Sequence, residues 1–194
     1  MAAPPTAESL ALLERFTAAL KARGVVTEAE IADQVARTDR ASPEIGARMV
    51  ARAWTDPAFH ALMIRDGTEA AERMGVSMAG APPLGVLEDT EAVHHLVVCT
   101  LCSCYPRMVL GYPPHWYKSA AYRARAVRDP RGVLAEWGTV LPAGVEVRVV
   151  DSTADYRWMV LPRRPAGTED WDEARLAAIV TRDALVGVSL PRAG

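Results

Sequence analysis

The sequence has few cysteines and few phenylalanines, and its net charge is small. Its 194 residues include three cysteines and two phenylalanines, and the formal net charge is -2. A slightly acidic protein is not attracted to nucleic acid or to an anionic membrane surface, so we expect neither as a partner. An odd number of closely spaced cysteines also excludes the disulfide framework of a small secreted protein.

Long apolar runs and a leader segment are also missing. The chain begins Met1-Ala-Ala-Pro-Pro, which has neither the basic start nor the apolar core of a signal peptide. No window approaches the roughly 20 apolar residues that a membrane-spanning helix requires. We therefore expect a cytoplasmic protein, and its 50% hydrophobic content is enough for a folded core.

The first third of the chain is predicted to be helical. Apolar residues recur at helical spacing in the first segment, and Thr27 with Glu30 forms a capping box that begins the second. These first two helices have no evident apolar partner, so they either pack on another subunit or fold back on the chain's own core. Helices are expected at residues 6–23, 27–37, 44–54, 56–67 and 68–74.

The remainder mixes strands with helices. Residues 75–87 are rich in Gly, Pro, Ser and Ala and predict a loop, whereas residues 93–98 predict a buried strand. The β-rich runs 145–150 and 156–161 flank a polar turn and predict a hairpin. Further helices are expected at residues 113–127, 129–137 and 172–181. We predict an α+β fold, with a helical N-terminal arm and linker over residues 1–84 and a layered α/β body over residues 85–194.

All the cysteines lie within six positions, at Cys99, Cys102 and Cys104. A structural zinc site needs a fourth ligand, which only a histidine is available to supply. An iron–sulfur cluster normally uses four cysteines, and a redox Cys-x-x-Cys pair would leave Cys104 unexplained. The histidines that could complete a zinc site are His60, His94, His95 and His115.

The run Cys102-Ser103-Cys104 favours a different coordination chemistry. Two thiolates and the deprotonated amide nitrogens of Ser103 and Cys104 make a square plane, because neighbouring donors close small chelate rings on a metal. Cys99 adds an axial sulfur and leaves one octahedral position open. Amidate donors suit a trivalent ion that acts as a Lewis acid, and an open position is what a catalytic site needs.

These residues also carry a family resemblance. Val98-Cys-Thr-Leu-Cys-Ser-Cys104 resembles the metal claw of the nitrile hydratase α subunit, and the likeness covers nearly the whole chain from about residue 44. Other similar segments, in the same order, are Ala53-Trp-Thr-Asp-Pro57, Asp66-Gly-Thr-Glu-Ala70, Gly111-Tyr-Pro-Pro-His-Trp-Tyr-Lys118, Arg128-Asp-Pro-Arg131 and Arg164-Pro-Ala-Gly-Thr168.

The resemblance implies an enzyme that hydrates a nitrile to an amide with non-corrin cobalt or non-haem iron. In that family a threonine at the position of Thr100 goes with cobalt, so we expect Co(III), with Fe(III) as the alternative. Cys102 would be oxidised to sulfinic acid and Cys104 to sulfenic acid, and both are expected to be catalytic. The nitrile carbon would be attacked by the Cys104 sulfenate oxygen or by a metal-activated water.

The resemblance also implies a hetero-oligomer. A β subunit, or separate chains equivalent to it, would complete the active site with arginines that hold the cysteine oxygens, and the N-terminal arm would wrap this partner. A metallochaperone or activator would load the metal. The alternatives are the metal subunit of thiocyanate hydrolase, which shares the claw, a non-catalytic metal-carrying assembly subunit, and a zinc-binding interaction domain.

The chain departs from the family pattern just after the claw. The family commonly continues Cys-x-x-Trp-Pro, whereas this chain has Tyr105, Pro106 and then Arg107. A guanidinium in place of an indole adds a charge and several hydrogen-bond donors. We predict that Arg107 and Tyr105 line a substrate pocket for a bulky heteroaromatic or nucleoside nitrile, of the toyocamycin type. Alternatively, Arg107 pairs with a carboxylate of the partner chain.

Overall fold

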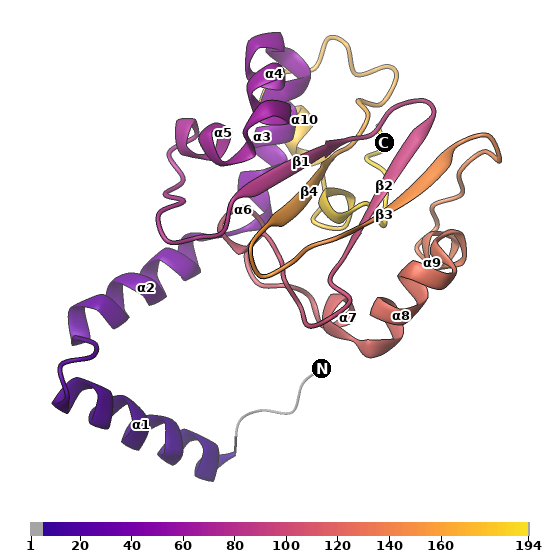
Figure 1. Cartoon of the computed structure of the whole chain (residues 1–194). Helices are drawn as coiled ribbons and strands as arrows, with labels where there is room; N and C mark the ends of the chain where they lie inside the picture. The colour runs from indigo at the N-terminus through magenta and orange to yellow at the C-terminus, as the bar shows by residue number, and fades with distance from the viewer. Residues whose placement is uncertain (1–5, 194) are drawn as a thin grey trace. The chain divides into compact units, whose positions relative to one another are not determined.

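The computed structural model describes residues 6–193. Its contacts divide the chain between Arg40 and Ala41 into two compact units (Figure 1). The first unit contains helices α1 (Ala7–Ala22) and α2 (Glu28–Arg40). The boundary that we predicted between residues 84 and 85 lies inside the second unit, because the helices before it pack on the strands and helices after it.

The two helices of the first unit begin at side-chain caps. The Thr6 hydroxyl accepts a hydrogen bond from the Ser9 N–H at 3.2 Å, and the predicted capping box is formed, with the Glu30 carboxylate accepting from the Thr27 N–H at 2.7 Å. Among the described residues of this unit, none is buried. Many of its apolar side chains remain exposed, including Leu10, Leu12, Leu13, Phe16 and Val35.

The second unit combines short helices with four strands. The strands are β1 (Leu84–Glu88), β2 (Val93–Val98), β3 (Glu146–Asp151) and β4 (Arg157–Leu161). The helices are α3 (Pro43–Thr55), α4 (Pro57–Arg65), α5 (Gly67–Arg73), α6 (Arg107–Leu110), α7 (His115–Lys118), α8 (Ala120–Arg128), α9 (Pro130–Glu136), α10 (Glu173–Ala178) and the 3-10 helix η1 (Ala184–Val186). This mixture confirms the predicted α+β class.

Two local predictions for the helices needed correction. The segment expected to form one helix over residues 113–127 is broken, because the Ser119 hydroxyl accepts from the Tyr122 N–H at 3.1 Å and caps a new helix, α8. Helix α6 was not predicted. It is a single turn after Pro106, and it ends at Gly111, whose φ of 69° is disfavoured for residues with a side chain.

The predicted hairpin is wrong. β3 pairs in parallel with β2, and β4 pairs in parallel with β1, so the two consecutive strands lie in different two-stranded sheets. β1 lies within the segment that we predicted to be a loop, residues 75–87, and is the partner that β4 needs. Both errors have one cause, because parallel pairing joins segments that are distant in sequence and leaves no local turn signal.

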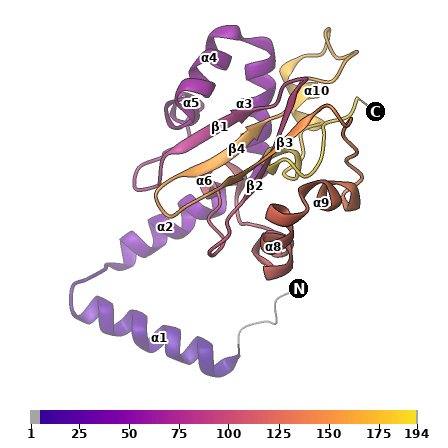
Figure 2. The ribbon, with the colours of Figure 1, turned by 45° about the vertical axis from the view of Figure 1, so that its right-hand side comes forward.

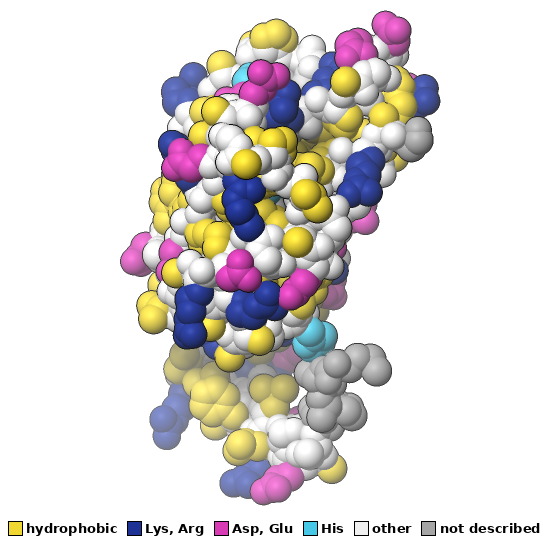
Figure 3. Space-filling view, turned by 90° about the vertical axis from the view of Figure 1, so that its right-hand side faces the viewer, with side chains coloured by type: hydrophobic (Ala, Val, Ile, Leu, Met, Phe, Trp, Pro, Cys, Tyr) yellow, Lys and Arg dark blue, Asp and Glu magenta, His cyan; other side chains and the backbone are white. Residues whose placement is uncertain are grey.

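Helices cover the strands on two sides. Helices α4 and α5 pack on β1, and α3 packs on α4, α6 and α10, whereas α8 packs on β2 and α9 on β3 (Figure 2). Leu96, Val97 and Val98 of β2 have no exposed surface, so this strand runs through the core. The face seen in Figure 3 interleaves side chains of both charges with apolar ones. In residues 6–193, no helix is long and apolar enough to cross a membrane.

Candidate metal centre

The cysteine cluster begins where β2 ends. Val98 is the last residue of the strand, Cys99 is 1% exposed beneath the surface, Cys104 is half-buried and Cys102 is exposed. The Cys99 and Cys102 sulfurs are 3.5 Å apart, and the Cys102 and Cys104 sulfurs are 3.3 Å apart. All three sulfurs lie within 4.8 Å of one another, as close as donors that share one metal ion.

Buried hydroxyl groups fix the backbone on either side of this cluster. The Tyr122 hydroxyl donates to the Val97 carbonyl at 2.7 Å, and the Tyr117 hydroxyl donates to the Cys104 carbonyl at 2.8 Å. Both tyrosines belong to an aromatic cluster in which Trp116 packs edge-on against each of them. Hydrogen bonds from this aromatic cluster therefore hold the backbone at both ends of the loop from Cys99 to Cys104.

Asp151 ties the loop to the neighbouring strand. As the last residue of β3, it accepts hydrogen bonds from the Thr100 N–H at 3.0 Å and from the Thr100 hydroxyl at 2.5 Å. On the other side, Arg123 of α8 donates to the Thr100 carbonyl at 3.3 Å. We did not single out Asp151 from the sequence, because only the parallel pairing of β2 and β3 brings it beside the loop.

The Cys102 and Cys104 thiols differ in acidity. Hydrogen bonds from the Cys104 and Cys99 thiols lower the pKa of Cys102 to about 7. Burial, followed by the hydrogen bond with Cys102, raises the pKa of the Cys104 thiol to about 12. The exposed Cys102 therefore ionises before Cys104, and a metal that binds the cluster would displace the proton of Cys104.

The donors fit the predicted metal and do not fit a four-ligand zinc site. Ser103 lies between Cys102 and Cys104, so the amide nitrogens of Ser103 and Cys104 are adjacent to their sulfurs, as the predicted square plane requires. No His, Asp or Glu in the described part of the chain joins the three sulfurs. Among the proposed zinc ligands, His60 pairs with Glu88 at 3.0 Å, and His94 and His95 are also engaged elsewhere.

His94 and His95 share one buried carboxylate. Asp89 lies 2.8 Å from His94 Nδ1 and 3.1 Å from His95 Nδ1, and it accepts the His95 N–H at 2.7 Å. His94 Nε2 lies 2.7 Å from the Gly187 carbonyl oxygen. Burial opposes ionisation of both partners, but their mutual attraction prevails and lowers the pKa of Asp89 while raising that of His94. The pair holds the start of β2 in place.

The two residues predicted to line a substrate pocket lie in different environments. Arg107 is exposed at the start of α6, and its guanidinium stacks over the Tyr112 ring, 4.7 Å from the centroid. Tyr105 is 2% exposed and packs edge-on against Tyr117, with ring centroids 5.0 Å apart. Within this chain the Tyr105 ring is part of the core, and its contact with a substrate stays a prediction.

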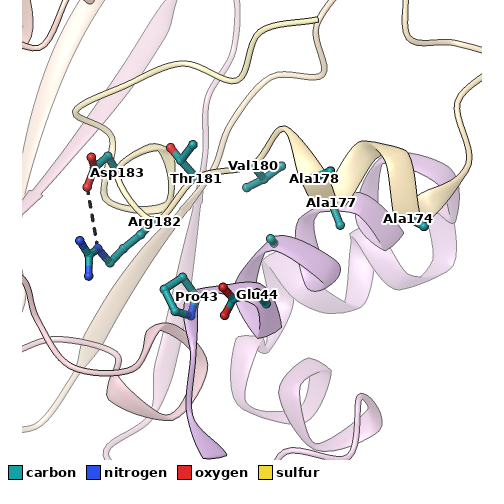
Figure 4. A pocket seen from close by; sticks show the side chains of 10 residues that line it. Pro43, Glu44, Ala174, Ala177, Ala178, Val180, Thr181, Arg182 and Asp183 are labelled. Carbon is teal, nitrogen blue, oxygen red and sulfur yellow. Dashed lines mark ion pairs between the residues drawn. The ribbon is translucent and has the colours of Figure 1, made fainter. Parts of the chain in front are cut away.

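A hollow of about 500 Å³ lies away from the cysteines, between the start of α3 and the segment that follows α10 (Figure 4). Small side chains of α10 form one wall, and Arg182 and Asp183 lie at one end, 3.9 Å apart. None of the three cysteines lines this hollow.

The chain is similar to known proteins over most of its length. The family described as nitrile hydratase, alpha chain, matches residues 7–189. The chain is 58% identical over 149 residues to the low-molecular weight cobalt-containing nitrile hydratase subunit alpha of Rhodococcus rhodochrous, a match that covers 77% of this chain and 72% of that protein. It is 50% identical over 163 residues to thiocyanate hydrolase subunit gamma of Thiobacillus thioparus, covering 78% of this chain and 67% of that protein.

The fold of this chain matches that of a solved structure along almost its whole length. A double mutant of Fe-type nitrile hydratase from Comamonas testosteroni Ni1 superposes with a TM-score of 0.86 at 42% identity, and the match covers 97% of this chain and 92% of that one. The resemblance inferred from the claw residues is thereby confirmed in both sequence and fold. This chain belongs to the nitrile hydratase α-chain family.

Proposed function

We propose that this chain is the metal-bearing catalytic subunit of a cobalt nitrile hydratase, which hydrates a nitrile to the corresponding amide. The observation that carries the proposal is the convergence of three sulfurs at the end of β2, in a chain 58% identical to a cobalt-containing nitrile hydratase α subunit. The nearby amide nitrogens of Ser103 and Cys104 supply the two further donors.

Different residues of this chain would bind the metal and react with the nitrile. The sulfurs of Cys99, Cys102 and Cys104 and the amides of Ser103 and Cys104 would hold the ion, which would supply Lewis-acid chemistry to the nitrile. Cys102 is exposed and has the lowered pKa, which favours its oxidation to the sulfinic acid. Cys104 would carry the sulfenate, whose oxygen attacks the nitrile carbon. Water then replaces the transferred oxygen on the Cys104 sulfur and supplies the two hydrogens of the amide.

Cobalt(III) is the metal we favour. Thr100 follows the first claw cysteine, and the Rhodococcus relative is cobalt-containing. The Comamonas structure is of the Fe-type, which makes Fe(III) the alternative. Metal analysis after expression with both metals supplied separates the two.

A β subunit, or chains equivalent to it, completes the site. Leu101, at the tip of the claw loop, is 88% exposed and lies beside the exposed Cys102, so a partner surface is required to shield the reacting groups from water. The exposed apolar residues of α1 and α2 offer a second contact surface for this partner. A metallochaperone or activator protein would deliver the metal.

Arg107 is the residue through which we expect substrate choice to be set. Its guanidinium lies over Tyr112 on the surface, three residues beyond Cys104. A polar nitrile such as a heteroaromatic or nucleoside nitrile can accept hydrogen bonds from it, whereas an aliphatic nitrile cannot use them beyond its single nitrogen. Equal turnover of both classes, unchanged by Arg107→Trp, would contradict this assignment.

The test is to co-express the chain with its β subunit in cobalt-supplemented medium and to measure amide formation, metal content and intact mass. We expect one cobalt per chain, added oxygens on the claw peptide and nitrile hydration. Cys104→Ala should abolish turnover. Zinc as the sole metal would overturn the proposal and support an interaction domain instead. Stable cobalt without turnover, even with the β subunit bound, would indicate an assembly subunit.

Thiocyanate hydrolase is the second candidate. Its support is the 50% identity to the γ subunit from Thiobacillus thioparus, comparable to that of the nitrile hydratases. Incubation of the same complex with thiocyanate, with detection of carbonyl sulfide and ammonia, distinguishes the two reactions. Thiocyanate turnover without nitrile turnover would select this alternative.

A further inference from the structure

We propose that the hollow beside α10 is a binding site for a small, uncharged carboxamide. A carboxamide is the class of product that nitrile hydration releases, so the inference rests on the proposed function for the source of the ligand. The site lies apart from the claw, because none of the three cysteines lines the hollow. An amide bound there would not touch the metal.

The hollow has the size and the apolar wall of a small-molecule site. Its volume of about 500 Å³ lies within the range of about 300–1,000 Å³ that is usual for ligand sites. On the α10 side the wall consists of methyl groups, because Ala174, Ala177 and Ala178 line it and share one side of the helix (Figure 4). The apolar part of a small ligand can rest on these methyl groups.

A hydrogen-bond donor and an acceptor without partners lie at one end of the hollow. Arg182 Nε and Asp183 Oδ1 are both buried, and neither atom has a hydrogen-bond partner among residues 6–193. The two atoms are 3.9 Å apart, which is too far for a hydrogen bond between them. Both residues line the hollow, so a ligand within it can reach this pair (Figure 4).

The Asp183 carboxylate caps no helix. Asp183 precedes η1, but its side chain makes no capping hydrogen bond, and only its backbone carbonyl accepts, from the N–H groups of Val188 and Ser189. Burial raises the pKa of this carboxyl, and the positive charge of Arg182 acts in the opposite direction. A buried carboxylate gains stability when a donor reaches it, so an N–H group of a ligand would be bound favourably.

A carboxamide matches this pair of atoms better than a charged group does. Its oxygen can accept from Arg182 Nε while its NH2 group donates to Asp183 Oδ1. A carboxylate would satisfy Arg182, but Asp183 and the Glu44 carboxylate of the α3 wall would repel it. An ammonium group would satisfy Asp183 but would meet the positive charge of Arg182.

A nitrile is also a poorer match. Its nitrogen can accept from Arg182 Nε, but it has no donor and leaves Asp183 Oδ1 without a partner. A site that is built to bind a donor discriminates strongly against an analogue that lacks it. The hollow should therefore select the product class over the substrate class.

The experiment uses the cobalt-loaded complex with the β subunit, in which the alanine methyl groups of this chain are isotope-labelled and observed by NMR. The probe is isobutyramide. Isobutyrate and methyl isopropyl ketone are the comparison ligands, because the first is charged and the second has an acceptor but no donor. The methyl groups of Ala177 and Ala178 report the hollow, and that of Ala120, which is exposed on α8, reports non-specific changes.

Three variants test the polar end and the apolar wall separately. Arg182→Met removes the donor, Asp183→Leu removes the acceptor, and Ala178→Leu fills the hollow from an exposed position. Arg163→Met is the matched control, because Arg163 is exposed and pairs with Glu91 on the surface, at 2.9 Å. Thermal unfolding shows whether each variant is folded, and Ala178→Leu serves as the test if a variant of the polar end does not fold.

We expect isobutyramide to shift the Ala177 and Ala178 signals and to saturate in the millimolar range, as is usual for so small a ligand. The two comparison ligands should bind at least about tenfold more weakly, because each leaves a buried polar atom unpaired. The three variants should each weaken amide binding by about tenfold or more, and Arg163→Met should leave it unchanged.

Nitrile hydration by the same complex is measured alongside, which separates the two proposals. Equal binding of the ketone and the amide, or no shift of the Ala177 and Ala178 signals, would overturn this inference alone. Selective amide binding by a complex that hydrates no nitrile would support the site but would overturn the proposed function as the source of its ligand.

Discussion

Thr100 donates both its N–H and its hydroxyl to the carboxylate of Asp151, at 3.0 Å and 2.5 Å. These two bonds connect the loop between Cys99 and Cys102 to the last residue of the parallel partner strand. The loop is thereby held at a second point besides its own strand. A claw whose ligands must lie within a few tenths of an ångström of the right geometry depends on such support.

We expect Asp151→Asn to weaken the centre. Asparagine keeps one acceptor oxygen but loses the charge and the second acceptor, which should cost about 1–2 kcal/mol in the free energy of unfolding and lower the cobalt content. Thermal unfolding and metal analysis measure both. Asp155→Asn is the control, because Asp155 is exposed in the following turn and its only described hydrogen bond uses its backbone N–H. Equal losses in both variants would show that the Thr100 contact is unimportant.

A double-mutant cycle isolates the Thr100 contact. Thr100→Val retains the shape of the side chain and the N–H donor but removes the hydroxyl donor to Asp151. Combined with Asp151→Asn, it should give a coupling free energy of about 1 kcal/mol, as is usual for residues that share a hydrogen bond. Denaturant unfolding of the wild type, both single variants and the double variant provides the four values. Strict additivity would mean that the two residues stabilise the chain independently.

Gly187, which lies beside the strand that precedes the cysteines, is predicted to tolerate a side chain poorly. Its φ is 83°, and a Cβ atom there would lie 1.9 Å from the His95 carbonyl oxygen, so Gly187→Ala would push the backbone of β2. We expect a loss of about 3 kcal/mol or more in unfolding free energy, together with reduced cobalt uptake.

Gly138→Ala is the matched control for Gly187→Ala. Its φ is 73°, but a Cβ atom there has no neighbour within 4 Å, so only the backbone conformation is strained, at about 1 kcal/mol. Thermal unfolding distinguishes the two costs. If Gly187→Ala and Gly138→Ala were equally destabilising, the close approach of the new Cβ atom to His95 would not contribute to the loss.

The stability contributed by Asp89 should depend on pH. The pKa of Asp89 is lowered from 3.8, so its contribution is present above pH 3.8 and is lost as pH falls through the lowered value. The pKa of His94 is raised from 6.5, so its contribution is present below pH 6.5 and is lost as pH rises through the raised value. The pair is therefore strongest between these two limits.

Asp89→Asn should lower the unfolding temperature most between about pH 4 and pH 6.5, with a loss of about 3 kcal/mol because a charge pair is broken in the interior. The difference from the wild type should shrink at higher pH, as His94 loses its proton. Glu91→Gln is the control, since Glu91 is exposed and forms only a surface pair, which contributes less than about 1 kcal/mol. A difference that stays constant from pH 5 to pH 9 would contradict the assignment of charge to His94.

Several features were predictable because their causes are local. The capping box of Thr27 and Glu30 forms as its spacing requires, and the apolar run over residues 93–98 is a buried strand that ends at the cysteines. The three cysteines lie within six positions, so their sulfurs need only a turn of the loop to come within 4.8 Å, although five extended residues could span about 17 Å. The chelating pattern and the family resemblance both depend on this short run.

The sequence alone predicted which residues form the candidate metal centre and indicated the family to which the chain belongs, because the residues that carry both are adjacent in the chain. Only the tertiary structure decided what surrounds them. Asp151 reaches the loop of the cysteines through parallel pairing between strands more than 50 residues apart, as the register of Val98 with Asp151 records. Such pairing leaves no turn signal in the chain, so the supports of the site emerge only when the strands are assembled.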